Sequence, residues 1–283
     1  MQTTTENKIA SNRSQIANLD AIKAKQKATW QSGDYGQIAQ SIENFAEEFM
    51  ARQSLRRGLR VLDVACGTGN LAVIAARHGC DVTGVDIAEN LLDQARARAA
   101  KAGLNIAFEE GDAEAMPFAD SSFDLSISMF GLMFAPQPER VATELQRVTK
   151  SGGHIALANW TPEGFIGKMF RVFKTHLPPT GVPSPLDWGN ESIVSQRLQS
   201  GFKDLRLTRR ITEMRFPFSP ADTVEYFRKY YGPTFRAFES LSETARQALR
   251  HDLVELQTRY NTAQSPDQTA VSAEYLEVIA TRI

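Results

Sequence analysis

The chain has 283 residues, enough for one large core or for a core with an appended lobe. Acids and bases nearly cancel to a net charge of -1, so no overall field attracts a polyanion and we expect no nucleic-acid partner. No signal-peptide pattern and no run of 18 apolar residues is found, which predicts a cytoplasmic protein without a membrane span. Only Cys66 and Cys80 are cysteines, which argues against a disulfide framework or a thiolate site, and we expect no metal.

The N-terminal part begins with about fifteen polar residues that we expect to be mobile. A helical pattern follows, in which Ile38, Ile42, Phe45 and Phe49 recur at i, i+4, i+7 and i+11. This spacing predicts one amphipathic helix with a single apolar stripe.

From Arg60 the chain alternates between apolar, β-branched runs and helical segments. The predicted strands are "RVLDVA", "DVTGVD", "NIAFEEGDA", "FDLSISMF" and "HIALANW". The predicted helices are "NLAVIAARHG", which Gly79 ends, and residues 89–102 and 138–148. Strands that alternate with helices predict right-handed crossovers and a parallel sheet covered on both faces.

After Trp160 this alternation breaks at the proline-rich segment 177–190, which we expect to be a non-helical loop. A helix near 191–199 and a strand near 204–212 resume it. Residues 219–262 read as two or three helices, and 272–283 as a closing strand. The pattern predicts one sheet domain with a helical insertion before its last strand.

"VLDVACGTGNLA", residues 61–72, places Gly67, Gly69 and Ala72 in G-x-G-x-x-A spacing at the first strand end. This spacing suits a dinucleotide and S-adenosylmethionine alike, because both bring a ligand close to a glycine backbone and a helix N-terminus. Asp63 favours S-adenosylmethionine, since a carboxylate at that position opposes a pyrophosphate but suits a cationic ligand. Asp86 at the second strand end fits either cofactor through its ribose.

Five motifs in order resemble those of class I S-adenosylmethionine-dependent methyltransferases, nearest the ubiquinone and menaquinone C-methyltransferases. They are "VLDVACGTGNLA", "VTGVDIAENLL", "GDAEAMPF", "FDLSISMFGLMFAP" and "LQRVTKSGGHIALANW", and they cover roughly residues 30–160. The resemblance implies a Rossmann-like, doubly wound α/β fold with a mostly parallel seven-stranded sheet and an antiparallel last strand. We expect an N-terminal helical cap (1–55), a cofactor-binding core (56–215), a helical insertion or lid (216–265) and a final core strand (266–283).

The resemblance also implies which residues bind S-adenosylmethionine: Tyr35, Asp63, Ala65, Gly67, Gly69, Asp86, Ile87, Asp112, Ala113 and Met129. Asp63, Ala65 and Gly67 would border the methionyl part, and the Met129 carbonyl would accept from its ammonium. The family often has glycine where this chain has Ala65, and alanine also allows the close approach of the backbone to the ligand.

Toward the nucleoside, the resemblance implies that Asp86 binds the ribose and Ile87 packs on the adenine. Asp112 and the Ala113 N–H would read the adenine edge. In the cap, Trp30 or Tyr35 would close over the methionyl group, or both would simply anchor the first helix to the sheet.

Methyl transfer is an in-line displacement at an activated sulfonium, so the enzyme supplies chiefly alignment and exclusion of water. The catalytic residues are unknown, and His176, His251 and Tyr231 are weak candidates. His78 and His154 read as structural, and Cys66 as a small side chain in a tight turn.

The acceptor is predicted to be a small, aromatic or apolar molecule. Position relative to the strand ends suggests four residues of its pocket: Phe134, Asn159, Trp160 and Tyr231. The protein is expected to act as a monomer or homodimer and to release S-adenosylhomocysteine.

Two alternatives remain open at this point. The glycine spacing admits an NAD-dependent oxidoreductase, although Asp63 disfavours it. The absence of a recognisable base also admits a protein that binds S-adenosylmethionine without methylating.

Overall fold

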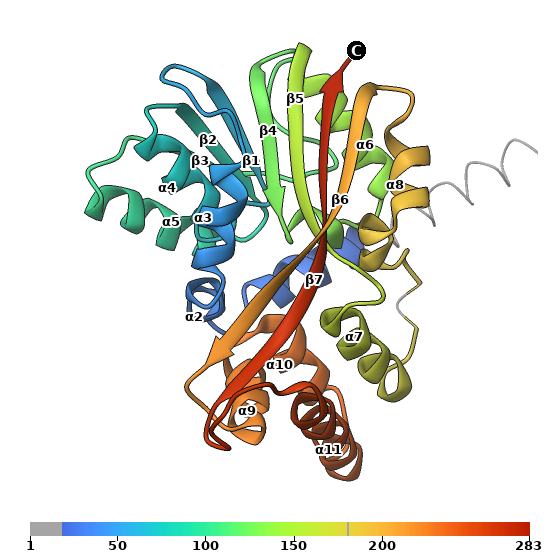
Figure 1. The fold of residues 1–283 in the computed structure, drawn as a ribbon. Coiled ribbons are helices and arrows are strands. Elements are labelled where there is room, and N and C mark those ends of the chain that lie inside the picture. Colours follow the sequence, from blue (N-terminus) through green and yellow to red (C-terminus); the bar gives the residue numbers. More distant parts are fainter. Residues whose placement is uncertain (1–18, 180) are drawn as a thin grey trace, which may run out of the picture.

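The computed structural model describes residues 19–179 and 181–283 (Figure 1). Its centre is a seven-stranded sheet of order β3-β2-β1-β4-β5-β7-β6, in which β7 runs antiparallel to its neighbours β5 and β6. The strands are β1 Arg60–Val64, β2 Asp81–Asp86, β3 Ala107–Glu110, β4 Phe123–Met129, β5 Thr149–Trp160, β6 Phe202–Phe216 and β7 Thr269–Arg282. The predicted Rossmann-like α/β fold with an antiparallel last strand is confirmed.

Helices cover the sheet and extend beyond one of its ends (Figure 1). Residues 19–30 are helical, and the other α-helices are α2 Tyr35–Gln40, α3 Glu43–Ala51, α4 Asn70–Arg77, α5 Glu89–Lys101, α6 Pro138–Val148, α7 Phe165–His176, α8 Glu191–Leu198, α9 Pro220–Tyr230, α10 Gly232–Glu239 and α11 Glu243–Tyr260. Two short 3₁₀ helices are η1 Leu132–Phe134 and η2 Pro185–Gly189. No helix of these described residues is long and apolar enough to cross a membrane.

The inner strands are buried along most of their length because both faces of the sheet are covered. In β1, four of the five residues are buried, and β4 has the same character. The parallel pairs β1–β2 and β1–β4 bring the carboxyl ends of these strands to one edge. The loops after them therefore meet at that edge, which is where the site is built.

The single N-terminal helix predicted from the sequence is wrong, since the structure divides its apolar stripe between α2 and α3. The Ser41 hydroxyl donates to the Ile38 carbonyl at 2.7 Å and closes the first helix. Ile42 then has φ -117° and ψ 12°, outside the helical region. Ile38, Phe45 and Phe49 are nevertheless buried, so the apolar face was correctly read while the backbone break was not. The polar residues 1–15, expected to be mobile, lie outside the described residues.

Helix α7 and the position of helix 19–30 within the expected helical cap were not predicted, and one prediction about the proline-rich segment is wrong. Helix α7 follows the fifth strand, and the helix at 19–30 precedes α2. Within the segment expected to be non-helical, η2 forms a 3₁₀ turn with Pro185 in its first turn. Proline suits that position, because its fixed φ matches a helix start and its missing N–H would be unpaired there.

Strands β6 and β7 continue past the rest of the sheet as a two-stranded ribbon (Figure 1). β5 pairs with β7 only from Tyr275 onward, whereas β6 follows it back to Thr269. Helices α9, α10 and α11 lie between these strands in sequence and pack together and against α7. They stand beyond the carboxyl edge of the parallel strands.

The turn before α2 is held against the α9–α10 junction by close backbone contact. Asp34 N–H donates to the Tyr230 carbonyl at 3.0 Å. A β-carbon on Gly232 would lie 2.1 Å from the Thr29 carbonyl oxygen, so glycine is required there. The Tyr226 hydroxyl adds a 2.8 Å hydrogen bond to the Gln37 carbonyl.

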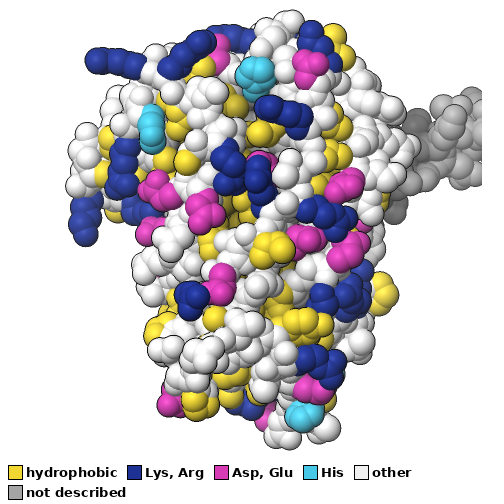
Figure 2. Space-filling model, in the orientation of Figure 1, with side chains coloured by type: hydrophobic (Ala, Val, Ile, Leu, Met, Phe, Trp, Pro, Cys, Tyr) yellow, Lys and Arg dark blue, Asp and Glu magenta, His cyan; other side chains and the backbone are white. Residues whose placement is uncertain are grey.

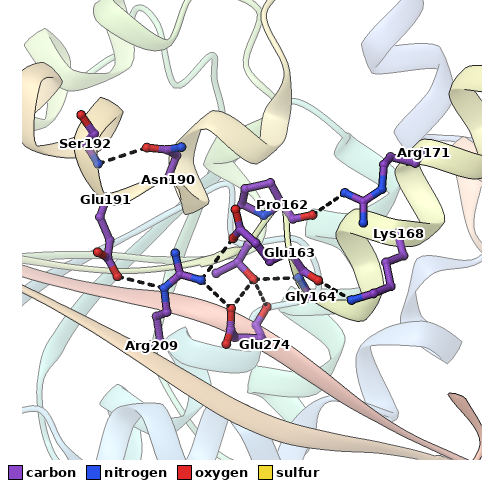
Figure 3. Close-up of polar contacts among 11 residues, drawn as sticks. Pro162, Glu163, Gly164, Lys168, Arg171, Asn190, Glu191, Ser192, Arg209 and Glu274 are labelled. Atoms are coloured by element: carbon purple, nitrogen blue, oxygen red, sulfur yellow. Dashed lines mark hydrogen bonds and ion pairs between the residues drawn. The ribbon is translucent and has the colours of Figure 1, made fainter.

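Positive and negative side chains are interspersed on the face shown in Figure 2. One charged cluster near the carboxyl edge joins several elements (Figure 3). Arg209 of β6 donates to Glu163, Glu191 and Glu274 at 2.9 to 3.1 Å. Glu274 of β7 also accepts from the Thr161 hydroxyl at 2.8 Å. The cluster therefore ties the loop after β5 and the start of α8 to the ribbon.

Arg209→Ala is expected to lower the free energy of unfolding by about 1 kcal/mol. The variant leaves three carboxylates close together without their cation, and the effect stays modest because the arginine side chain is 40% exposed. Urea denaturation at low ionic strength measures the change. The control Arg215→Ala removes a 75% exposed side chain of the same strand and should cost less than half as much. Equal losses would contradict the role assigned to the cluster.

Candidate functional site

A cavity of about 350 Å³ opens at the carboxyl edge of the parallel strands. Its volume lies within the range of small-molecule sites. The walls are formed by the ends of β1, β2 and β4, the loop after β3, η1, helix 19–30 and α2. They include Lys23, Lys27, Trp30, Tyr35, Asp63, Ala65, Gly67, Asp86, Ile87, Glu110, Asp112, Ala113, Met129, Phe130 and Phe134.

All the residues predicted to bind the cofactor line this cavity except Gly69. Gly69 lies at the start of α4 with φ +78°, a conformation that favours glycine. A β-carbon there would lie 3.2 Å from the Phe108 ring. Gly69 therefore serves the turn and the packing of α4, and Gly67 is the glycine that faces the cavity.

Asp86 holds the glycine loop in place from the end of β2. Its Oδ2 accepts from the Gly67 N–H at 2.8 Å, and its Oδ1 accepts from the Ala88 N–H at 2.9 Å. Burial raises the pKa of this carboxyl, although the backbone donors act in the opposite direction. Each oxygen has one fixed donor and keeps lone-pair capacity for a ligand hydroxyl.

Asp63, at the end of β1, is 2% exposed and accepts from the Ala72 N–H at 3.0 Å. Burial raises its pKa to about 8, and the nearby charge of Asp86 adds to the increase. A cation placed beside it would favour the ionised form. The site therefore favours a ligand with a positive end.

Two residues of the cavity wall have the left-handed backbone conformation that usually favours glycine. Ala65 has φ 54° and Phe130 has φ 61°. Gly131 follows Phe130, and a β-carbon on it would lie 2.4 Å from the Ala65 carbonyl oxygen. The ends of β1 and β4 thus meet in close backbone contact. The glycine that the family often has at position 65 matches this conformation, which alanine adopts at some cost.

Asp112 has a partner that the sequence analysis missed. Lys23 Nζ lies 2.6 Å from Asp112 Oδ2 and 2.5 Å from Glu114 Oε2. Lys27, four residues later on the same helix, pairs with Glu110. The spacing of the lysines was a visible signal, but it indicated only that they share a helix face.

Four aromatic rings meet at the other end of the cavity. The Trp30 ring centroid lies 5.0 Å from that of Phe134 and 5.8 Å from those of Tyr35 and Tyr231. Withdrawal from water raises the pKa of both tyrosines, so their hydroxyls are neutral near pH 7. The rings offer an apolar wall next to Gly67, whose added β-carbon would lie 3.4 Å from the Tyr35 ring.

Among the four residues predicted for the acceptor pocket, Phe134 lines the cavity and the others do not. Trp160 stacks on Phe130 with ring centroids 3.7 Å apart, behind the wall. Asn159 is fully buried, and neither of its amide atoms has a hydrogen-bond partner among the described residues. Tyr231 lies behind the cavity wall, where its ring contacts those of Trp30 and Tyr35.

The remaining candidates lie away from the cavity. His176 contacts Asp252 with 2.7 Å between Nε2 and Oδ2, across α7 and α11. His251 is exposed and groups with Asp252 and Glu255 so closely that the three could hold a metal ion, although exposed groups of this kind are common without one. Burial raises the pKa of the Cys66 thiol, which keeps it protonated and unreactive.

Comparisons with known proteins agree with this geometry. Residues 61–153 match the family described as a methyltransferase domain. An uncharacterized protein of Mycobacterium tuberculosis is 41% identical over 220 residues, covering 76% of this chain and 80% of that protein. The demethylmenaquinone methyltransferase of Deinococcus radiodurans is 38% identical over 125 residues, which cover 42% of this chain and 52% of that protein.

A solved structure with the same fold is a Haemonchus contortus phosphoethanolamine N-methyltransferase bound to S-adenosylmethionine. Its TM-score is 0.54 at 19% identity, over 84% of this chain and 52% of that one. At 19% identity this likeness shows a shared fold and carries no conclusion about the substrate.

Proposed function

The chain belongs to the class I S-adenosylmethionine-dependent methyltransferases. We propose that its cavity holds S-adenosylmethionine and that the enzyme transfers the methyl group to a small apolar or aromatic molecule. The observation that carries the proposal is the pair of buried carboxylates, Asp63 and Asp86, on neighbouring strand ends beside the glycine loop. Asp86 suits a ribose, and Asp63, which a neighbouring cation would ionise, suits an ammonium and offers a pyrophosphate no favourable contact. The oxidoreductase alternative is set aside with the family assignment.

The lining residues support a definite placement of the cofactor. Asp63 and the Met129 carbonyl would receive the ammonium of the methionyl end. Asp86 would accept from the ribose hydroxyls while it continues to hold Gly67. Asp112 would accept from the adenine amino group. The cofactor would then be enclosed along its length by the glycine loop, the strand ends and the helix at 19–30.

The reaction needs little from the protein beyond alignment. When bound, S-adenosylmethionine supplies a methyl carbon on a positively charged sulfur. An electron pair of the acceptor would form the new bond to that carbon, the electrons of the carbon–sulfur bond would stay on sulfur, and a proton displaced from the acceptor would pass to water. The aromatic wall of Trp30, Tyr35 and Phe134 would hold the acceptor in line with that bond and exclude water.

The acceptor class rests on this wall and on the relatives. The rings give an acceptor flat, apolar contact area. The name of the Deinococcus radiodurans relative makes quinols and naphthols the first acceptors to test. We propose a small molecule of this kind, and a monomeric or homodimeric enzyme.

The cofactor assignment is tested by thermal unfolding with S-adenosylmethionine, S-adenosylhomocysteine and NAD. A ligand at a hundred times its dissociation constant stabilises the folded chain by about 2.7 kcal/mol. We expect this shift with the two sulfur compounds, and a larger shift with NAD would overturn the proposal. Transfer of labelled methyl to phenols, quinols and amines tests the activity, and cofactor binding without transfer to any of them would favour the non-methylating alternative.

Trp30→Ala is expected to raise the KM for the acceptor about tenfold while the affinity for S-adenosylhomocysteine changes less. The variant removes the ring that contacts Phe134 and Tyr231 together, and with it roughly 1.4 kcal/mol of apolar contact. Steady-state kinetics with the best acceptor measure the change, and Trp30→Phe should retain most of the affinity. An unchanged KM in the alanine variant would show that the cluster only anchors the helix.

A further inference from the structure

Helix 19–30 is joined to the adenine end of the proposed cofactor site by charged side chains. Lys23 and Lys27 lie four residues apart and so share one face of the helix. They meet Asp112, Glu114 and Glu110, which follow or end β3. Two ammonium groups therefore face three carboxylates across the boundary between the helix and the core.

Glu114 distinguishes this contact from a surface ion pair. Its side chain is 0% exposed, and that of Lys23 is 27% exposed. The second oxygen of Glu114 accepts from the Gln137 N–H at 2.6 Å, which fixes the carboxylate. Burial would lower the pKa of Lys23, but its hydrogen bond to Asp112 and the adjacent carboxylate of Glu114 outweigh it and raise the pKa. Without Lys23, Glu114 would be a buried charge without its cation, which is costly.

Lys23 also fixes the orientation of Asp112. Asp112 Oδ1 accepts from the Glu114 N–H at 2.8 Å, and Oδ2 accepts from Lys23 at 2.6 Å. With one donor on each oxygen, the plane of the carboxylate is set. A lone pair remains for a further donor.

The opposite end of the same helix face reaches the acceptor side of the cavity. The Gln26 amide donates to the Phe134 carbonyl at 2.5 Å. The Trp30 ring packs edge-on against the Phe134 ring. One helix thus borders both ends of the cavity.

We propose that helix 19–30 is a lid over the cofactor, and that Lys23 is the positioning residue that holds it closed and orients Asp112 toward the adenine. The inference rests on the proposed cofactor site. The cofactor is exchanged when Lys23 separates from its two carboxylates, so the strength of this contact sets the rate of exchange.

The test measures how fast S-adenosylhomocysteine dissociates from the full chain when displaced by excess S-adenosylmethionine. Lys23→Met should speed dissociation about tenfold, and Lys23→Arg should remain near the wild type. Lys25→Met, an exposed lysine of the same helix, should also remain near it. Raising the salt from about 0.05 to about 0.5 M should speed dissociation from the wild type more than from Lys23→Met. Equal rates and equal salt dependence for Lys23→Met and the wild type would overturn the proposal.

Amide hydrogen exchange of the cofactor-free protein gives a second measurement that does not depend on the cofactor. Residues 19–30 should exchange faster in Lys23→Met than in the wild type or in Lys25→Met. Unchanged exchange would refute the lid even if the cofactor binds. A wild-type chain that binds no S-adenosylhomocysteine would refute the cofactor site and the action of Lys23 on adenine, and exchange would then decide the closure of the helix alone.

Discussion

Asp86→Ala is expected to weaken the binding of S-adenosylhomocysteine by about 100-fold, or about 2.8 kcal/mol. The Gly67 and Ala88 N–H groups lose the charged acceptor that holds the loop, and the ribose of the proposed cofactor would lose its partner. Hydrogen bonds to a charged group contribute about 1.5 to 3 kcal/mol each, so the loss of the ribose contact together with the loosening of the loop accounts for this change. Isothermal titration at pH 7 measures it.

The control for this variant lies on the same strand. Asp81 begins β2, and its side chain is 75% exposed. Asp81→Asn should bind the cofactor as the wild type does. Asp86→Asn keeps the shape of the side chain and should bind better than the alanine variant while remaining weaker than the wild type. If Asp86→Ala is folded by urea denaturation and binds with unchanged affinity, Asp86 has no part in the cofactor site.

Asp63→Asn is expected to make the stability of the cofactor-free protein fall less steeply with pH between about 5 and 8. The folded-state pKa of Asp63 is raised to about 8, mainly by burial, above the ordinary aspartate value of 3.8. Between these values the unfolded chain has lost the proton that the folded chain retains. Stability therefore falls as pH rises, by about 1.4 kcal/mol per pH unit for one whole proton, and this contribution is complete only below the unfolded pKa.

Urea denaturation at several pH values measures this slope for the wild type and the variant. The contribution of Asp86, whose pKa is also raised, is present in both proteins and largely cancels in the difference. Asp81→Asn serves again as the exposed control and should retain the wild-type slope. Parallel pH curves for Asp63→Asn and the wild type would show that Asp63 is ionised in the free protein at neutral pH.

The sheet and the strand-end carboxylates were predictable because both depend on local patterns. Buried parallel strands are apolar runs, and parallel topology brings their carboxyl ends to one edge, so Asp63 and Asp86 could be assigned to one site. The contact of Lys23 with Asp112 joins residues 89 positions apart, and no local pattern encodes it. The break between α2 and α3 also escaped prediction, since an apolar stripe continues across it.

The helix at 19–30 shows why the cap was read least well. Its inner face carries Lys23, Gln26 and Lys27, polar residues that normally indicate a face toward water. They lie inward because the core presents carboxylates and a carbonyl to them. Hydrophobic periodicity does not detect a helix that is docked through charge. Of the residues predicted for the acceptor pocket, Trp160 stacks behind Phe130 instead of facing the cavity, and its position at the end of the fifth strand did not indicate which way its ring turns.

The position of β7 has a consequence for how the molecule folds. β7 pairs with β5 on one side and β6 on the other, and His154 is the partner of Thr281, far along the chain. Such non-local pairings slow folding because a long loop must close first. Until β7 arrives, β5 presents an unpaired edge whose residues Ile155, Leu157 and Trp160 are apolar, a template for pairing with other chains. The extent to which refolding depends on chaperones should therefore follow from how slowly β7 inserts between β5 and β6.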